Sequence, residues 1–143
     1  MKATELLKQD HREAMDLINQ LESAGSNGAN TETFAKLKAA LTLHTKLEES
    51  LLYPALENFD ETRDLIRESY REHRQVDELL AEMMKPADDW KDKLSDLKDD
   101  IEHHVDEEEN EMFPKALKLL GEERLEEMGK QMEEAKRGRS ANA

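Results

Sequence analysis

Apolar residues recur along most of this chain every third or fourth position, which is the spacing of one helix face. Four long stretches show the pattern, at about residues 4–23, 30–54, 60–85 and 90–114, and a shorter one covers 122–136. None of the chain gives the alternating pattern of a strand. The chain is therefore predicted to be all-α, with four long amphipathic helices and a short additional C-terminal helix.

Residues that end or begin helices lie between these stretches. Glycine and asparagine at residues 25–28 supply the left-handed backbone that ends the first helix. Asn30 or Thr31 suits the cap of the second helix, and Asp60 the cap of the third. The third helix is expected to stop before Pro86, because proline cannot continue it.

Two prolines fall inside the second and fourth stretches. Pro54 and Pro114 have no amide proton to donate, so each is expected to kink or end its helix, although residues 115–120 can continue for a turn or more. The last helix is expected at 122–136, after Gly121. Residues 1–137 are predicted to form a single domain, followed by a disordered tail at 138–143.

Four histidines stand at nearly even intervals, one on the apolar face of each long stretch. They are His11, His44, His73 and His104, and the midpoints between them fall in the predicted turns. In an antiparallel bundle the chain returns to one height after each turn, so the histidines are expected at one level, about 20 Å from the helix ends. This predicts an up-down-up-down four-helix bundle.

Composition supports the helical class and limits the partners. Hydrophobic residues make up 36% and charged residues 39%, and the net charge is −14. No nucleic acid is expected as a partner, because phosphate binding depends on clustered Lys and Arg. No apolar run approaches membrane-spanning length and the amino terminus lacks a signal core, so no membrane is expected and a cytoplasmic location is the default. The absence of cysteine excludes thiolate ligands.

The two halves of the chain repeat one polar motif. Glu48 follows His44 by four residues, as Glu108 follows His104, so each pair lies on one helix face. Four imidazoles and two carboxylates in a bundle interior suit a pair of iron or manganese ions, whereas a single zinc needs only about four ligands. So many buried ionisable groups would be costly without a metal. The predicted metal ligands are His11, His44, Glu48, His73, His104 and Glu108.

This ligand pattern resembles the hemerythrin-like family, also called the HHE cation-binding domain. The resemblance covers about residues 3–120 and includes the segments Leu51-Leu52-Tyr53-Pro54 and Glu111-Met112-Phe113-Pro114. It implies a bundle with a non-haem di-iron centre, in which the four histidines are terminal ligands and the two glutamates bridge the metals. Mn or Zn are expected as substitutes for iron.

One position departs from the oxygen-carrying members of that family, which have a further histidine four residues after the third ligand. Asp77 occupies this place, and the fifth histidine, His103, points about 100° around its helix from the fourth ligand. Without a fifth inward histidine, a coordination position on the metals would be open or filled by water, or another carboxylate such as Asp77 or Glu49 would occupy it. Tyr70 is either a hydrogen-bond donor to a ligand on the metals or an ordinary core residue.

Three kinds of function are consistent with these residues. The first is a redox-active di-iron protein that binds or senses dioxygen, another small diatomic molecule or peroxide. The second is an enzyme that acts on peroxide, oxygen or nitric oxide, or that repairs damaged iron centres. The third is an iron buffer, or an acidic interaction domain that needs no metal. Asp77 in place of a histidine favours a redox or sensing protein over a simple oxygen carrier, and no protein partner is predicted.

Overall fold

Every regular element in the described part of the chain is a helix, which confirms the all-α class. The computed structural model describes residues 1–24, 28, 29 and 31–142, without the side chains of 139–142. Residues 25–27 of the first turn predicted at 25–28, and the alternative cap Asn30, lie outside these residues. The long helices are α1 (Ala3–Ser23), α2 (Glu32–Leu47), α4 (Arg63–Met83), α5 (Trp90–Glu107) and α7 (Glu122–Asn142).

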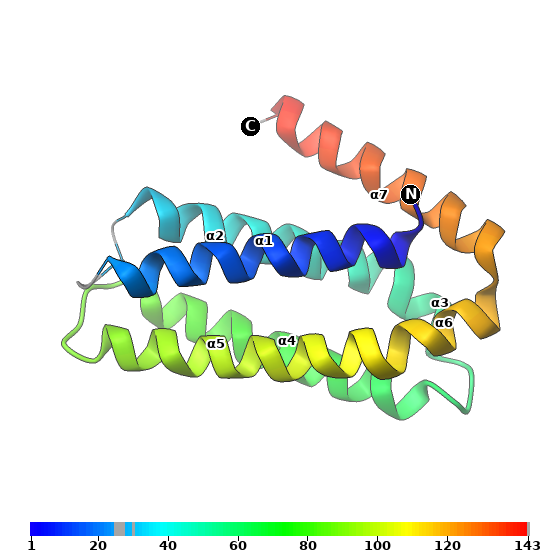
Figure 1. Ribbon diagram of the computed structural model, residues 1–143, viewed down its shortest axis with the longest axis horizontal. Coiled ribbons are helices and arrows are strands. Elements are labelled where there is room, and N and C mark those ends of the chain that lie inside the picture. Colours follow the sequence, from blue (N-terminus) through cyan, green and yellow to red (C-terminus); the bar gives the residue numbers. More distant parts are fainter. Residues whose placement is uncertain (25–27, 30, 143) are drawn as a thin grey trace.

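Helices α1, α2, α4 and α5 lie side by side and alternate in direction, as Figure 1 shows. Helix α1 packs mainly against α2, and α4 against α5, while α1 also contacts α5. Helix α7 folds back over this bundle and contacts α1 and α2. The arrangement is a helical bundle of the predicted kind, with one further helix on its outside. No helix among the described residues combines the length and the apolar character needed to cross a membrane.

Two π-helical segments continue the second and fourth bundle helices. The amide of the residue before each proline donates to a carbonyl five residues back, from Tyr53 to Glu48 and from Phe113 to Glu108. This wider turn accommodates a proline that cannot donate, so the predicted interruption is a bulge and not an end. The segments are η1 (Glu48–Leu52), followed by α3 (Tyr53–Leu56), and η2 (Glu108–Met112), followed by α6 (Phe113–Leu120).

The helix boundaries differ from the prediction at two places. Thr62, and not Asp60, is the residue that precedes α4, and the Asp60 carboxylate instead lies 3.1 Å from the guanidinium of Arg63. Helix α7 continues to Asn142 beyond the predicted end at Lys136, so residues 138–142 are helical where a disordered tail was predicted. The predicted end rested on the general tendency of chain termini to lack order.

Two apolar clusters fill the bundle, and a polar layer lies between them. One cluster includes Leu7, Leu52 and Met112 and is completed by Leu125, Met128 and Met132 from the apolar face of α7. The other includes Ile18, Leu41, Leu80, Trp90 and Ile101. In α1, His11 falls between Leu7 of the first cluster and Ala14 of the second. The predicted level of the histidines is therefore confirmed for α1, inside the bundle and away from its ends.

Candidate metal centre

Six buried side chains meet in the polar layer. They come from α1, from α2 and its continuation η1, from α4, and from α5 and its continuation η2. The histidines are 5–8% exposed and the two glutamates are 0% exposed. Each glutamate begins a π-helical segment, and such bulges occur frequently at functional sites. The structure thus brings together all the residues predicted as ligands, which are His11, His44, Glu48, His73, His104 and Glu108.

These six residues form two groups that share both glutamates. In each group the ligand atoms all lie within 4.8 Å of one another, which is close enough for one metal ion. The first group is His11, His44, Glu48 and Glu108, and the second is Glu48, His73, His104 and Glu108.

The shared glutamates contact histidines of both groups. Glu48 Oε1 lies 3.0 Å from His44 Nε2 and 3.1 Å from His73 Nε2. Glu108 Oε1 lies 3.0 Å from His11 Nε2, while its Oε2 lies 3.1 Å from the Nε2 atom of the fourth histidine. A carboxylate between two pairs of imidazoles can bridge two ions, as in bundle di-metal sites.

The outward nitrogen of every histidine in the site faces a carboxylate. The Nδ1 atoms of His11, His44, His73 and His104 lie 2.7, 3.0, 2.7 and 2.6 Å from oxygens of Glu109, Asp10, Glu49 and Glu72 respectively. Such contacts fix the orientation and tautomer of a ligating imidazole and direct its other nitrogen at the metal. All four Nε2 atoms are therefore available on the inner side of the site.

The sequence prediction did not assign these four carboxylates to the histidines. The repeat carried the signal, because Asp10 and Glu72 each precede a histidine and Glu49 and Glu109 each follow a bridging glutamate. Glu49 was considered as a metal ligand, but its carboxylate faces Nδ1 of His73 and belongs to neither four-residue group. Glu49 therefore orients the candidate ligand His73 and is not itself one of the candidate ligands.

A tyrosine that the prediction did not single out reaches the second group. The Tyr53 hydroxyl donates to Glu108 Oε2 at 2.5 Å and lies 3.1 Å from His73 Nε2. Tyr70, for which a donor role and a core role were both open, packs edge-on against the Tyr53 ring, with 5.3 Å between the ring centroids. The counterpart of Tyr53 in the other repeat is Phe113, which has no hydroxyl and stacks on a histidine of the first group. The two groups therefore have different surroundings.

Two further candidates lie outside the paired groups. Asp77 is exposed and lines a surface pocket beside Lys46 and Glu49, and it belongs to neither group. His103 is 65% exposed, as expected from its direction, and its Nε2 lies 2.9 Å from Glu107 Oε1. Because Asp77 is exposed, it adds no further ligand to these six at the position where oxygen carriers have a fifth histidine.

The buried side chains of the site have shifted pKa values that reflect their mutual attraction. Burial acts to raise the pKa of Glu48, but the charge of His44 and hydrogen bonds to its neighbours hold that pKa well below its usual range. Burial acts to lower the pKa of His44, but the charge of Glu48 and the contact with Asp10 raise it to about 10. Burial likewise acts to lower the pKa of His104, but the charge of Glu108 and its carboxylate contacts hold that pKa well above its usual value. Without metal, the proton on His44 therefore offsets the charge of the buried Glu48.

Two buried atoms of the site have no hydrogen-bond partner, namely Glu48 Oε2 and His44 Nε2. The latter lies 3.0 Å from Glu48 Oε1 but without the geometry of a hydrogen bond. An unsatisfied buried carboxylate oxygen is costly, and a metal ion would satisfy both atoms. Imidazole and carboxylate donors suit iron, manganese and zinc, so the residues present fit a metal pair.

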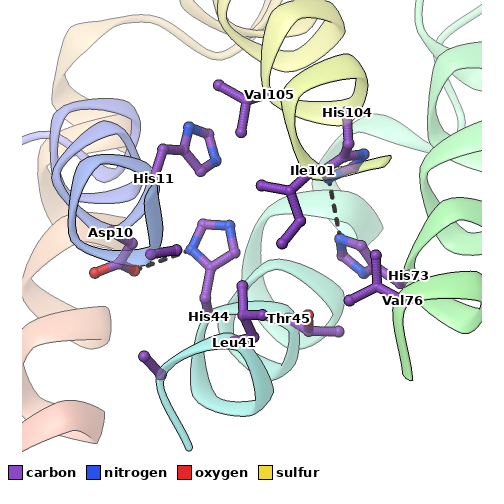
Figure 2. A pocket seen from close by; sticks show the side chains of 12 residues that line it. Asp10, His11, Leu41, His44, Thr45, His73, Val76, Ile101, His104 and Val105 are labelled. Carbon is purple, nitrogen blue, oxygen red and sulfur yellow. Dashed lines mark hydrogen bonds and ion pairs between the residues drawn. The ribbon is translucent and has the colours of Figure 1, made fainter. Parts of the chain in front are cut away.

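A small cavity of about 30 Å³ lies beside the four histidines. Figure 2 shows the histidine rings around it, with Leu41, Val76, Ile101 and Val105 as its apolar wall. Leu52 and Met112 lie on the opposite side of the site, in the first apolar cluster. Apolar side chains therefore lie on both sides of the site, and the cavity has room for about two water-sized atoms.

The chain is similar to a known protein family and to two named proteins. The family described as hemerythrin HHE cation binding domain matches residues 2–116. The chain is 26% identical over 139 residues to a protein of Nostoc sp. named DNA nickase, covering 95% of this chain and 39% of that protein. It is 25% identical over 141 residues to an uncharacterized hemerythrin-like protein of Schizosaccharomyces pombe, covering 95% of this chain and 70% of that protein. No solved structure shows a significant match.

Proposed function

The chain belongs to the hemerythrin HHE cation-binding domain family, and we propose that its two histidine–glutamate groups hold a pair of non-haem iron ions. The observation that carries this proposal is the sharing of two fully buried glutamates between two pairs of histidines. The same nitrogen and oxygen donors would accept manganese or zinc as substitutes. A bound iron pair supplies one-electron redox changes and a position for a small exogenous ligand.

We propose that this ligand is dioxygen, another small diatomic molecule or peroxide. The cavity beside the histidines has a volume of only about 30 Å³, so it suits a molecule of about two heavy atoms better than a larger substrate. Its wall is apolar apart from the imidazoles and a few polar neighbours. A site of this size and polarity suits binding or sensing of a small molecule better than the recognition of an organic substrate.

The residues around the histidines would keep this site rigid and chemically asymmetric. The carboxylates on the Nδ1 atoms hold each ring in place, and the two apolar clusters keep bulk water from both sides of the polar layer. The Tyr53 hydroxyl lies at Glu108 and His73, while Phe113 occupies the equivalent place in the other half. Tyr53 would hold a proton beside His73 and beside the Glu108 oxygen that faces His104.

This asymmetry also supports a second candidate function. A proton donor at one metal position is useful for reducing peroxide, oxygen or nitric oxide, each of which takes up protons. Multiple turnover with peroxide, or reduction of nitric oxide, would favour this enzyme over a sensor. Two irons per chain with no spectral response to ligands would instead favour an iron buffer.

We propose that this chain does not bind nucleic acid, although one relative is named a DNA nickase. The chain spans 39% of that relative, and its net charge of −14 opposes binding to phosphates. Retention of labelled DNA by the purified chain at low salt would contradict this proposal.

Metal analysis followed by optical spectroscopy tests the main proposal. Protein made in iron-replete medium should contain about two irons per chain, as expected for two groups of four ligands. Its near-ultraviolet absorption should be lost on reduction, return with oxygen and change with azide. Protein that contains no transition metal, and whose melting does not change when iron is added, would refute the proposal.

A further inference from the structure

Helix α7 lies outside the family match and yet packs closely on the bundle. Leu125, Met128 and Met132 are buried in the first apolar cluster. At Gly129 a Cβ atom would lie 1.9 Å from the Met1 carbonyl oxygen, so only glycine permits this approach to the amino terminus. The helix is therefore docked in a defined position and is not a loose extension.

One side chain of α7 reaches the support of a proposed metal ligand. The Lys136 ammonium donates to Asp10 Oδ1, and Asp10 Oδ2 lies 3.0 Å from Nδ1 of His44, where it accepts the imidazole proton. Figure 2 shows the Asp10 carboxylate turned toward His44, with that contact drawn as a dashed line. The Asp10 side chain is 11% exposed. Lys136, Asp10 and His44 thus form a continuous series of hydrogen bonds from α7 to the interior of the site.

The equivalent position in the other half of the repeat is built differently. Glu72 supports His104 at 2.6 Å, and its other oxygen lies 3.5 Å from His103 of α5. Helix α7 therefore contributes through Lys136 to the group that contains His11 and His44. An interaction with an element outside the bundle distinguishes this group from the one that contains His73 and His104.

We infer that Lys136 is a positioning residue of the metal centre, which holds Asp10 against His44 and so links the docking of α7 to metal binding at the first group. This inference rests on the proposed function. Residues that orient a ligating histidine typically contribute 10- to 100-fold to metal affinity, and Lys136 acts one contact further out. Because such coupling is reciprocal, a metal at the first group should also hold α7 more firmly.

Stepwise titration of the metal-free full chain with Co(II), followed by absorption and calorimetry, tests the inference. We expect the unmodified chain to bind two ions, and Lys136→Met to bind one of them about tenfold more weakly with the other unchanged. Lys136→Arg should restore most of the loss, since it keeps the donor and the charge. Lys130→Met, which changes an exposed residue of the same helix, should behave as the unmodified chain.

A second variant separates positioning from general damage to the fold. If Lys136 acts through Asp10, Asp10→Asn combined with Lys136→Met should bind Co(II) no more weakly than Asp10→Asn alone, whereas independent effects would add. Hydrogen exchange of the α7 amides should slow when Co(II) is added to the unmodified chain, and should slow less in Asp10→Asn. A merely structural contact would not produce this dependence on metal.

The outcomes distinguish the inference from the proposed function. If the unmodified chain takes up no Co(II) and no iron, the proposed function fails and the inference fails with it. If it takes up two ions but Lys136→Met matches Lys130→Met, the inference alone is overturned. Tighter binding by Lys136→Met would also overturn it, because removing the lysine charge strengthens Asp10 as an acceptor and only a loss of position weakens binding.

Discussion

Replacing Glu48 with glutamine should remove both metal ions from the protein, although it changes one group in one side chain. Glu48 Oε1 lies 3.0 Å from His44 Nε2 and 3.1 Å from His73 Nε2, so a single carboxylate serves both four-residue groups. Glutamine keeps the shape but loses the charge, and a neutral amide cannot bridge two cations. His73→Ala, by contrast, removes a residue of one group only.

The magnitude follows from the number of ligands. A four-ligand protein site for Zn²⁺ contributes about 10–16 kcal/mol, or roughly 2.5–4 kcal/mol per ligand. Losing one ligand from each group should therefore weaken the binding of each metal ion by roughly a few hundredfold, since each factor of ten in affinity corresponds to about 1.4 kcal/mol. The lost charge acts in the same direction, because Glu48 is completely buried and its attraction for a cation is weakly screened.

Equilibrium dialysis against Co(II) or Fe(II), followed by elemental analysis, measures this effect. At a free metal concentration about tenfold above the dissociation constant of the unmodified chain, we expect Glu48→Gln to retain almost no metal. His73→Ala should retain about one ion, and Glu111→Gln, an exposed change in η2, about two. Two ions bound by Glu48→Gln at unchanged affinity would refute the shared role of Glu48, and one ion would assign it to a single group.

Four further predictions test other parts of the structure. Stripping both metal ions should lower the melting temperature by roughly 20–30 °C relative to protein with metal at about 1,000 times its dissociation constant, because each site then contributes about 4 kcal/mol, and an unchanged calorimetric transition would contradict this. The folded-state pKa of His44 is raised from 6.5 to about 10, so its contribution to metal-free stability is full below pH 6.5 and lost as the pH rises toward 10; urea midpoints should fall over this window, and His44→Ala should flatten the curve. Tyr53→Phe should lower metal-free stability by about 1–3 kcal/mol, because Glu108 Oε2 loses a buried donor; Tyr70→Phe is the matched control, and equal urea midpoints for the two variants would argue against the contact. Gly129→Ala should displace α7, which limited proteolysis of the C-terminal helix would detect as faster cleavage, and unchanged cleavage would show that the amino terminus can yield.

The sequence alone was sufficient for the helices and for the level of the site. An apolar period of three to four residues sets a helix and its buried face, so each predicted long helix is found, and His11 lies between the two apolar clusters. A His-x-x-x-Glu pair needs no tertiary information, because four residues along one helix bring both side chains to one face. The six candidate ligands could therefore be named from their order in the chain.

The sequence did not determine what happens after each bridging glutamate. Both helices widen into a π-helical segment before proline, and the extra residue shifts the phase of everything that follows. A regular helical count therefore fails beyond Glu48. Tyr53, the first residue after η1, turns inward to Glu108.

Tertiary structure also decided which residues support the histidines. Glu49 reaches His73 from another helix, and Lys136 of α7 reaches Asp10 across more than a hundred residues of sequence. Such contacts depend on the rotation and axial shift of packed helices, which the period of the apolar residues leaves undetermined. The order of residues thus specified the ligands of one buried layer, and the packing of the helices specified how each ligand is held and why the two halves of the site differ.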